Sequence, residues 1–212
     1  MLDRSDDLRI ISECAHDFFS NKHAARERAL QLSRGTIQLA SKSIRSTHRN
    51  ELEQADALLN SARGLVEEMM EIKSDHPDIY YTGFVQDAQK EYVEAILTLA
   101  LIADRPFTLP NEIGISLAAY LNGLGETIGE MRRYLLDSLR RGETSRCETV
   151  LDIMDQIHTE LFTMDFPEAI TGGLRRTTDA MRGILERTRG DLTNALRQQK
   201  LSEQIDRLMD KT

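Results

Sequence analysis

Residues 5–48 form a stretch of the sequence with no proline and a single glycine. Apolar residues recur along it at the three- and four-residue spacing of a helix; they are Leu8, Ile11, Ala15, Phe18, Leu30, Ile37, Ala40 and Ile44. The pattern predicts one long helix or two in tandem. A continuous helix here would be on the order of 65 Å long at 1.5 Å per residue. That length exceeds a compact chain of 212 residues, so we expect an elongated bundle or an assembly.

The remainder of the chain also predicts helices. Its 12 glycines and 4 prolines are few, and the prolines lie near expected helix starts or loops. The expected helices cover 50–74 with Asn50 as N-cap, 77–104, 113–141, 144–163, and a last one after Pro167 that runs past 205 and is broken near "TGG". No strand-like alternation is present. We expect a single all-α domain over residues 1–212, an elongated bundle of six to seven helices.

Composition excludes several classes of protein. The longest apolar run, "AILTLALIA", is about half of a membrane span, and the N-terminus carries early acidic residues rather than the apolar core of a signal peptide. Cys14 and Cys147 lie far apart and lack metal-ligand spacing, which indicates reduced thiols in a cytoplasmic protein. The short apolar run and the negative net charge lead us to expect no membrane partner. The net charge of −8 argues against a polyanion as partner, unless the clustered arginines form a separate surface.

Two predicted helices each carry a pair of glutamates one turn apart. Glu91 and Glu94 begin the most apolar segment, and Glu126 and Glu130 lie in "GETIGEMRR". If the two helices pack together, these carboxylates can converge on a hard cation such as Mg²⁺ or Mn²⁺. The alternative is a solvated acidic face, since most charged residues are exposed. A di-iron site is disfavoured because neither segment contains the Glu-x-x-His pair that such sites use.

Basic residues gather in three groups, in 22–49, in 132–141 and in 175–189. The first group has few close acids and favours binding to a polyanion. In the third group, Arg175, Asp179, Arg182, Glu186 and Arg189 have the spacing of intrahelical ion pairs, which is an equally good interpretation. The candidates for contact with nucleic acid are Arg26, Arg34, Lys42, Arg45, Arg49, Arg132, Arg133 and Arg176.

Four segments together resemble the translin superfamily, and more closely its TRAX (translin-associated factor X) branch in a compact, archaeal-type version. They are "RALQLSRGTIQLASKSIRSTHR" (28–49), "QKEYVEA" (89–95), "YLNGLGETIGEMRR" (120–133) and "FPEAITGGLRRTTDAMRGILERTRGDL" (166–192). The second is similar to the TRAX motif QEYVEA and is the most specific. The resemblance covers residues 15–200.

The resemblance implies a seven-helix protomer that assembles into a hollow octamer and holds single-stranded RNA or DNA inside. It further implies a metal-dependent endoribonuclease whose carboxylates are Glu91, Glu94 and Glu126, with Glu130 as a further ligand. The pure translin branch lacks the carboxylates that match Glu94 and Glu126. TRAX usually carries Asp at the position of Glu126; the longer side chain should still reach a metal.

These observations lead to a main hypothesis and two alternatives. The main hypothesis is a Mg²⁺- or Mn²⁺-dependent endoribonuclease that binds and cleaves single-stranded RNA inside an oligomeric shell. The first alternative is a non-catalytic, translin-like protein that binds single-stranded RNA or DNA. The second is a purely structural helical assembly with solvated acidic faces. A gel shift followed by a nuclease assay separates the three.

Overall fold

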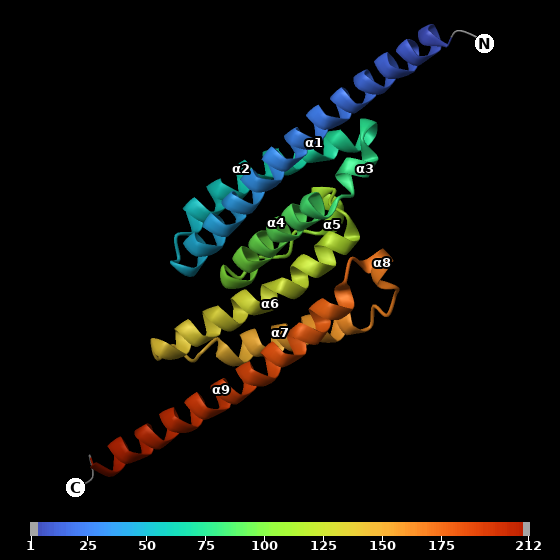
Figure 1. The fold of residues 1–212 in the computed structure, drawn as a ribbon. Coiled ribbons are helices and arrows are strands. Elements are labelled where there is room, and N and C mark those ends of the chain that lie inside the picture. Colours follow the sequence, from blue (N-terminus) through green and yellow to red (C-terminus); the bar gives the residue numbers. More distant parts are fainter. Residues whose placement is uncertain (1–3, 210–212) are drawn as a thin grey trace.

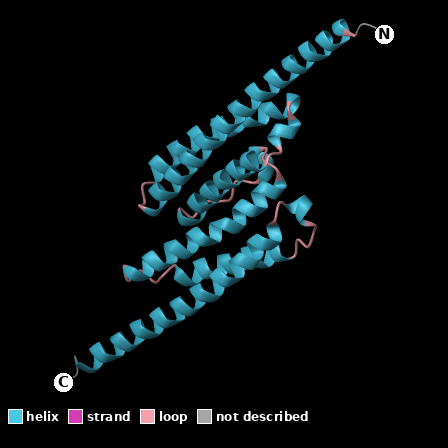
Figure 2. Cartoon of the chain, viewed as in Figure 1, coloured by secondary structure: helices cyan, strands magenta, loops and turns pink. Residues whose placement is uncertain are grey.

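The structure is a computed structural model that describes residues 4–209, and within this range the chain forms helices and loops but no strand (Figures 1 and 2). The all-α prediction is therefore confirmed. The helices are α1 Ser5–His48, α2 Leu52–Asp75, α3 Pro77–Tyr80, α4 Gly83–Ile102, α5 Pro110–Ile113, α6 Leu117–Arg140, α7 Cys147–Phe162, α8 Glu168–Thr171 and α9 Leu174–Met209. Six of the helices are long and three are single turns. None of the helices over residues 4–209 has the length and hydropathy needed to cross a membrane.

The stretch that opens the chain is one continuous helix, α1, of 44 residues. The prediction of Asn50 as an N-cap is wrong. Asn50 has a left-handed φ of 61°, and it lies in the turn between α1 and α2, where the N-cap position is Glu51. Asparagine tolerates this conformation better than most residues, so it reverses the chain instead of capping the next helix.

Two predicted helices are interrupted near their starts. The helix expected over 77–104 divides at Tyr81 and Thr82 into α3 and α4, and the one expected over 113–141 begins at Leu117 after the separate turn α5. Ser116 caps α6 by accepting a hydrogen bond from the Ala119 amide at 3.2 Å. The predicted break at "TGG" is confirmed, because Gly172 and Gly173 both have positive φ between α8 and α9.

The long helices form a stack in which each layer packs on the next (Figure 1). The hairpin of α1 and α2 contacts α4, α4 contacts α6, and α6 contacts α7 and α9. One hydrophobic core lies among α1, α2 and α4, and a second among α6, α7 and α9. Phe107, Leu121 and Leu124 pack against both cores. The start of α1 and the end of α9 extend beyond the stack on opposite sides (Figure 1).

Two glycines of α6 allow its neighbours to come unusually close. A Cβ atom on Gly123 would lie 2.7 Å from the Lys90 carbonyl oxygen and 2.8 Å from Val93 Cβ, both on α4. A Cβ atom on Gly125 would lie 2.5 Å from Thr177 Cγ2 on α9. Real Cβ atoms essentially never come this close to other atoms, so α6 packs against α4 and α9 only because these positions have no side chain.

We predict that Gly123→Ala destabilises the protein, because the new methyl group meets a backbone carbonyl that cannot move aside alone. Overpacking of this kind costs about 1–3 kcal/mol, which corresponds to roughly 2–4 °C in melting temperature per kcal/mol for a chain of this size. Gly129→Ala on the same helix is the matched control: no atom lies within 4 Å of its Cβ position, so it should raise stability by up to about 1 kcal/mol. Thermal unfolding followed by circular dichroism checks both, and a Gly123→Ala protein that melts with or above the parent contradicts the prediction.

Candidate metal centre

Helix α4 has an apolar side that is buried in the core and an acidic side that faces α6. Its buried side, which includes Tyr92, Val93 and Leu97, packs into the first core. Glu91 and Glu94 lie on the other side and are half-buried beneath the approach of α6. The apolar residues therefore fix the rotation of α4, and this rotation aims the two carboxylates at α6.

The third carboxylate comes from α6. Glu126 follows Gly125 directly and lies one turn beyond Gly123, the residue that lets α6 approach α4. One oxygen from each of Glu91, Glu94 and Glu126 lies within 4.8 Å of the other two. The structure thus brings together the three carboxylates that the sequence analysis selected.

The donor set matches a hard divalent cation. All three donors are carboxylates and all three side chains are half-buried, while Mg²⁺ binds oxygen ligands at about 2.0–2.1 Å. Two oxygens on one such ion lie at most roughly 4.2 Å apart, so the group needs only a small contraction to hold one. No histidine or cysteine of residues 4–209 belongs to the group, which favours Mg²⁺ or Mn²⁺ over softer ions.

Burial, together with mutual repulsion in the group, raises the pKa values of two of its carboxyl groups. Burial, reinforced by the negative charges of Glu91 and Glu126, raises the pKa of Glu94 to about 8. Burial and the charge of Glu126 also raise the pKa of Glu91. The chain therefore holds carboxylates where their charged forms are unfavourable, as is common at functional sites. A bound cation would relieve this cost.

Lys90 is the basic residue that contacts this group. Its Nζ lies 2.9 Å from Glu126 Oε1 and 3.8 Å from Asp87 Oδ1. Burial alone would lower the pKa of Lys90, but the hydrogen bond and charge of Glu126 outweigh burial and raise it. Lys90 and Asp87 are site residues that the sequence analysis did not select. Their spacing could have indicated this, because residues three or four positions apart on a helix lie on the same face. Such spacing links Asp87, Lys90, Glu91 and Glu94 on α4.

Glu130, the fourth predicted ligand, lies one turn beyond Glu126 and is held by other partners. Its carboxylate is 2.5 Å from His48 Nε2 and 3.6 Å from Arg133 Nη1. The hydrogen bond from His48 lowers the pKa of Glu130, with a further contribution from Arg133. The charge of Glu130 in turn contributes to the raised pKa values of Glu91 and Glu94, so it belongs to the same electrostatic unit without joining the group of three.

No pattern in the sequence points to the role of His48, which is 82 residues from Glu130. Its side chain is 5% exposed, at the end of α1, and it fixes Glu130 of α6 across the α4 layer. The role of such a residue becomes visible only when the packing of α1 on the rest of the stack is known.

The carboxylate group opens into a groove between α4, α6 and α9. Two adjoining depressions share Glu126, Arg176 and Thr177; one includes Glu94 and Ile184, and the other includes Asp87 and Lys90. Arg176 is exposed and has no ion-pair partner among residues 4–209. A positive side chain on α9 therefore faces the same groove as the carboxylates of α4 and α6.

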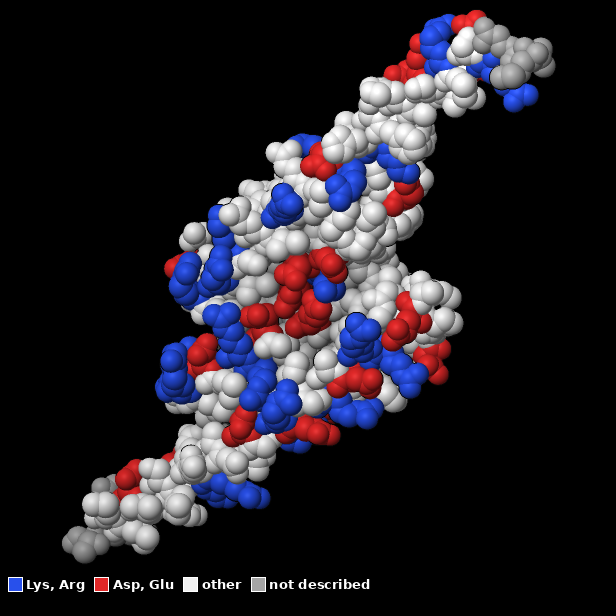
Figure 3. Space-filling model, viewed as in Figure 1, with Lys and Arg blue, Asp and Glu red and all other residues white. Residues whose placement is uncertain are grey.

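The other predicted nucleic-acid contacts divide into two sets. Arg26 pairs with Glu27, Arg49 with Glu51, Arg132 with Asp191, and Arg133 with Glu130. Arg34, Lys42 and Arg45 are exposed on α1 and make no ion pair within residues 4–209. Figure 3 shows acidic side chains gathered over α4 and α6, with basic side chains on both sides, over α1 and over α6 and α9. Basic side chains thus border the acidic centre on this face of the molecule (Figure 3).

The predicted intrahelical ion pairs of α9 do not form among the residues described. Arg189 instead donates to Asp155 of α7 at 3.0 Å, and Arg182 lies 5.5 Å from the centre of the Phe162 ring. Arg189 and Arg182 therefore hold α9 against α7, Arg182 at the last residue of α7. Arg176 is the basic residue of α9 that lines the groove.

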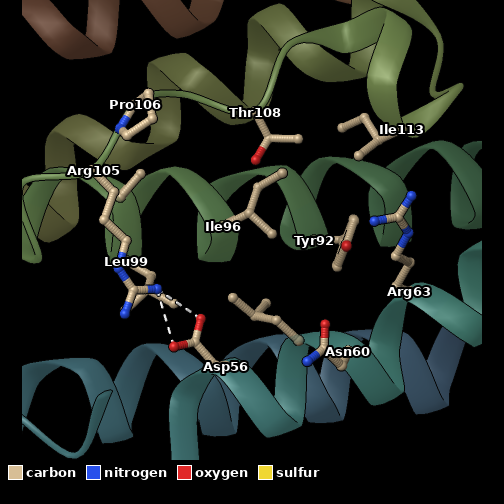
Figure 4. Close-up of a pocket in the computed structure, with 12 residues that line it drawn as sticks. Asp56, Asn60, Arg63, Tyr92, Ile96, Leu99, Arg105, Pro106, Thr108 and Ile113 are labelled. Atoms are coloured by element: carbon tan, nitrogen blue, oxygen red, sulfur yellow. Dashed lines mark hydrogen bonds and ion pairs between the residues drawn. The ribbon is translucent and has the colours of Figure 1, made fainter. Parts of the chain in front are cut away.

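A further depression lies on the other side of α4, between α2 and the loop that follows α4 (Figure 4). Arg105 crosses it and donates to both oxygens of Asp56 at 2.8 and 3.0 Å, which ties the loop to α2. Leu59, Ile96 and Leu99 form much of its wall. Asp56 and Arg105 satisfy each other, and Arg63, which also lines the depression, pairs with Glu67. The depression therefore braces the fold and offers no cluster of free ligands.

No family model matches the chain, but solved structures do. AfC3PO in complex with duplex RNA is 33% identical, with a TM-score of 0.80 over 87% of this chain and 95% of that one. A crystal structure of AfC3PO matches equally, with 96% of that chain covered. This chain belongs to the translin/C3PO family. The predicted resemblance is confirmed.

Two more distant proteins are also similar to this chain. An uncharacterized protein of Methanocaldococcus jannaschii is 27% identical over 193 residues, which cover 91% of this chain and 86% of that protein. Apo-NeC3PO is 20% identical, with a TM-score of 0.76 over 92% of this chain and 98% of that one. At this identity the likeness to NeC3PO shows the translin/C3PO fold alone.

We predict that the metal-free protein loses stability as pH rises. Glu94 has a pKa of about 8 when folded against an ordinary value of 4.5, so its stabilising contribution is full below about 4.5 and is lost as the pH rises through about 8. Melting temperatures in EDTA should therefore fall between about pH 5 and about pH 8.5, and saturating Mg²⁺ should restore more of the loss at the higher pH.

Glu94→Gln tests the origin of this slope, because it removes the titrating group and should flatten the decline. Glu67→Gln is the control, since Glu67 pairs with Arg63 on the exposed face of α2 and should leave the slope unchanged. An equal decline in the parent and in Glu94→Gln would show that other groups cause it.

Proposed function

We propose that this chain is a cytoplasmic, metal-dependent endoribonuclease that binds and cleaves single-stranded RNA. The observation that carries the proposal is the convergence of Glu91, Glu94 and Glu126 within 4.8 Å, beside a groove that Glu94, Glu126 and Arg176 line. Acidic ligands beside free basic side chains are what phosphodiester cleavage requires, because the same site must hold a cation and attract a polyanion.

The carboxylates would hold Mg²⁺ or Mn²⁺, with Glu91, Glu94 and Glu126 as ligands and Glu130 as a further one. When bound, such an ion activates a water molecule and neutralises charge that develops on the phosphate. Glu130 is near enough to affect the pKa values of Glu91 and Glu94. Its hydrogen bond to His48 keeps it in the charged form, which is the form that binds a cation.

The basic residues would hold the strand by its phosphates. Arg34, Lys42 and Arg45 on α1 and Arg176 on α9 are exposed and without ion pairs within residues 4–209; Arg26, Arg49, Arg132 and Arg133 would join after release from their acids. Contacts of this kind make binding sensitive to salt and nearly independent of sequence. The complex of AfC3PO with duplex RNA supports RNA as the partner of this chain.

The apolar surface of the projecting helices supports assembly into a homo-oligomer, for which we propose a hollow octamer. Leu8, Ile11 and Phe18 lie along one side of α1 and are each more than 60% exposed. Leu201 and Ile205, near the end of α9, are also exposed, at 57% and 47%. A stripe of this kind is unfavourable in water and typical of a protein interface. An enclosed basic lumen would let a chain of net charge −8 bind RNA.

A second candidate function is non-catalytic binding of single-stranded RNA or DNA. The row of free basic residues on α1 favours it, because Arg34, Lys42 and Arg45 make no contact with the carboxylate group. Under this function the acidic group would bind a metal for stability, and the strand would remain intact.

We predict that Glu91→Gln combined with Glu94→Gln lowers the cleavage rate of a labelled single-stranded RNA by about 100-fold or more, since disturbance of the supporting groups of a metal site alone costs 10–100-fold. The assay is denaturing electrophoresis with Mg²⁺ or Mn²⁺ against EDTA, with duplex RNA alongside. Glu67→Gln is the control. Gel shifts in EDTA should show that the double variant still binds. Equal cleavage by parent and double variant refutes the metal assignment, and a parent that binds but does not cut favours the second candidate.

We predict that the purified chain elutes near eight times its chain mass of 24.1 kDa in size exclusion with light scattering at micromolar concentration. Replacing Leu8, Ile11 and Phe18 together by serine should shift it to smaller species, because the apolar contact area is lost. Replacing the exposed Asp6, Glu13 and Asp17 of the same helix by serine is the control. A parent that elutes as a monomer overturns the proposed assembly.

A further inference from the structure

Lys90 occupies a position that the proposed nuclease mechanism does not explain. Its ammonium group lies 2.9 Å from Glu126 Oε1, and Glu126 also belongs to the group of three carboxylates. The side chain is 24% exposed, and it lines the groove that runs on to Arg176. A positive charge is thus held directly against the candidate cation site.

We infer that Lys90 is an internal counter-ion that a divalent cation displaces from Glu126, and that the released ammonium group then contacts a phosphate of the bound strand. The inference rests on the proposed function, and it assigns to Lys90 a role that changes with metal occupancy. Lys90 would be a competitor of the metal in the free protein and a ligand of the substrate in the loaded protein.

Competition follows from charge and geometry. Three carboxylates within 4.8 Å of one another repel strongly, and the positive charge of Lys90 partly offsets this repulsion at Glu91 and Glu94. The oxygen of Glu126 that accepts from Lys90 has less capacity left for a cation, and a nearby positive charge opposes the approach of a second one. Metal binding at Glu126 must therefore weaken or break the contact with Lys90.

The released side chain has a defined place to go. The groove beside Glu126 is lined by Asp87, Lys90 and Asn122 on one side and by Arg176 and Thr177 on the other. Arg176 approaches this groove from α9 and Lys90 from α4. A phosphate that enters the groove near Glu126 would therefore lie between two cationic side chains. Lysine suits this exchange because its ammonium group is a compact point charge on a flexible stem.

A fixed, purely structural ion pair is the competing explanation. Under this explanation Lys90 and Glu126 only tie α4 to α6, and the pair would respond neither to metal nor to RNA. The two explanations therefore differ in measurements that do not require cleavage.

The first measurement is Mn²⁺ binding by isothermal titration calorimetry, without RNA. Lys90→Gln removes the competing charge and should bind Mn²⁺ about tenfold more tightly than the parent, whereas Lys90→Arg should remain near the parent. Lys22→Gln is the matched control, because Lys22 forms a similar pair with Asp78 away from the groove. Unchanged or weaker binding by Lys90→Gln overturns the inference, provided that its melting curve shows it to be folded.

The second measurement is the salt dependence of single-stranded RNA binding, with Ca²⁺ as the ion and the intact strand verified on a denaturing gel. Loss of one phosphate contact lowers the slope of log K against log salt by about 0.7. Lys90→Gln should show this loss with Ca²⁺ and none in EDTA, where Glu126 holds Lys90 in the parent. Equal slopes in both conditions, or an equal loss in both, contradict the exchange. A parent that binds no Mn²⁺ refutes the proposed function itself, whereas a parent that binds Mn²⁺ with the same affinity as Lys90→Gln refutes the inference alone.

Discussion

The close contact between α4 and α6 is the constraint on which the candidate site depends. Gly123 places the α6 backbone against the Lys90 carbonyl, and Gly125 places the opposite side of α6 against Thr177 of α9. Glu126 follows directly, at the line where three helices meet. Ordinary helices with side chains at both contacts pack 8–10 Å apart, and carboxylates on them would not converge as closely. In the four-residue segment "GLGE", the two glycines therefore permit close packing and the glutamate supplies a candidate metal ligand.

This contact stabilises the fold through apolar packing and at the same time creates an electrostatic cost. Val93 and Leu97 are buried on the side of α4 that faces the core, so α4 cannot turn to release Glu91 and Glu94 into water. The raised pKa values of both residues record that cost. Lys90 and His48 offset part of it, each by contact with a glutamate of α6. An electrostatic cost of this kind can persist when the packing of the rest of the fold is stable enough to offset it, and it is expected at a functional site.

Much of this arrangement could be predicted from the sequence because it follows from local periodicity. The helix over 5–48, the break at Gly172 and Gly173, and the two glutamate pairs depend on spacing within one segment. The breaks before α4 and α6 were missed because single turns interrupt an otherwise apolar pattern. His48 and Lys90 could not be paired with Glu130 and Glu126, because these contacts join residues 82 and 36 positions apart and depend on which helices become neighbours. Asn50 was misassigned because a residue with cap preference also suits a left-handed turn.

The division of the apolar interior into two cores has a consequence for cooperativity of folding. Helices α1, α2 and α4 bury most of one core, and α6, α7 and α9 bury most of the other. The two cores meet at α4 and α6: Ala119 and Tyr120 of α6 belong to the first core, Ile102 of α4 belongs to the second, and Phe107, Leu121 and Leu124 pack against both. Such halves can open separately in native-state fluctuations, and the carboxylates of α4 and α6 lie on opposite sides of the boundary. An ion bound there would link the two halves and oppose their separate opening. Its occupancy would then be reported by hydrogen exchange of amides far from the ligands, across the whole seam between α4 and α6.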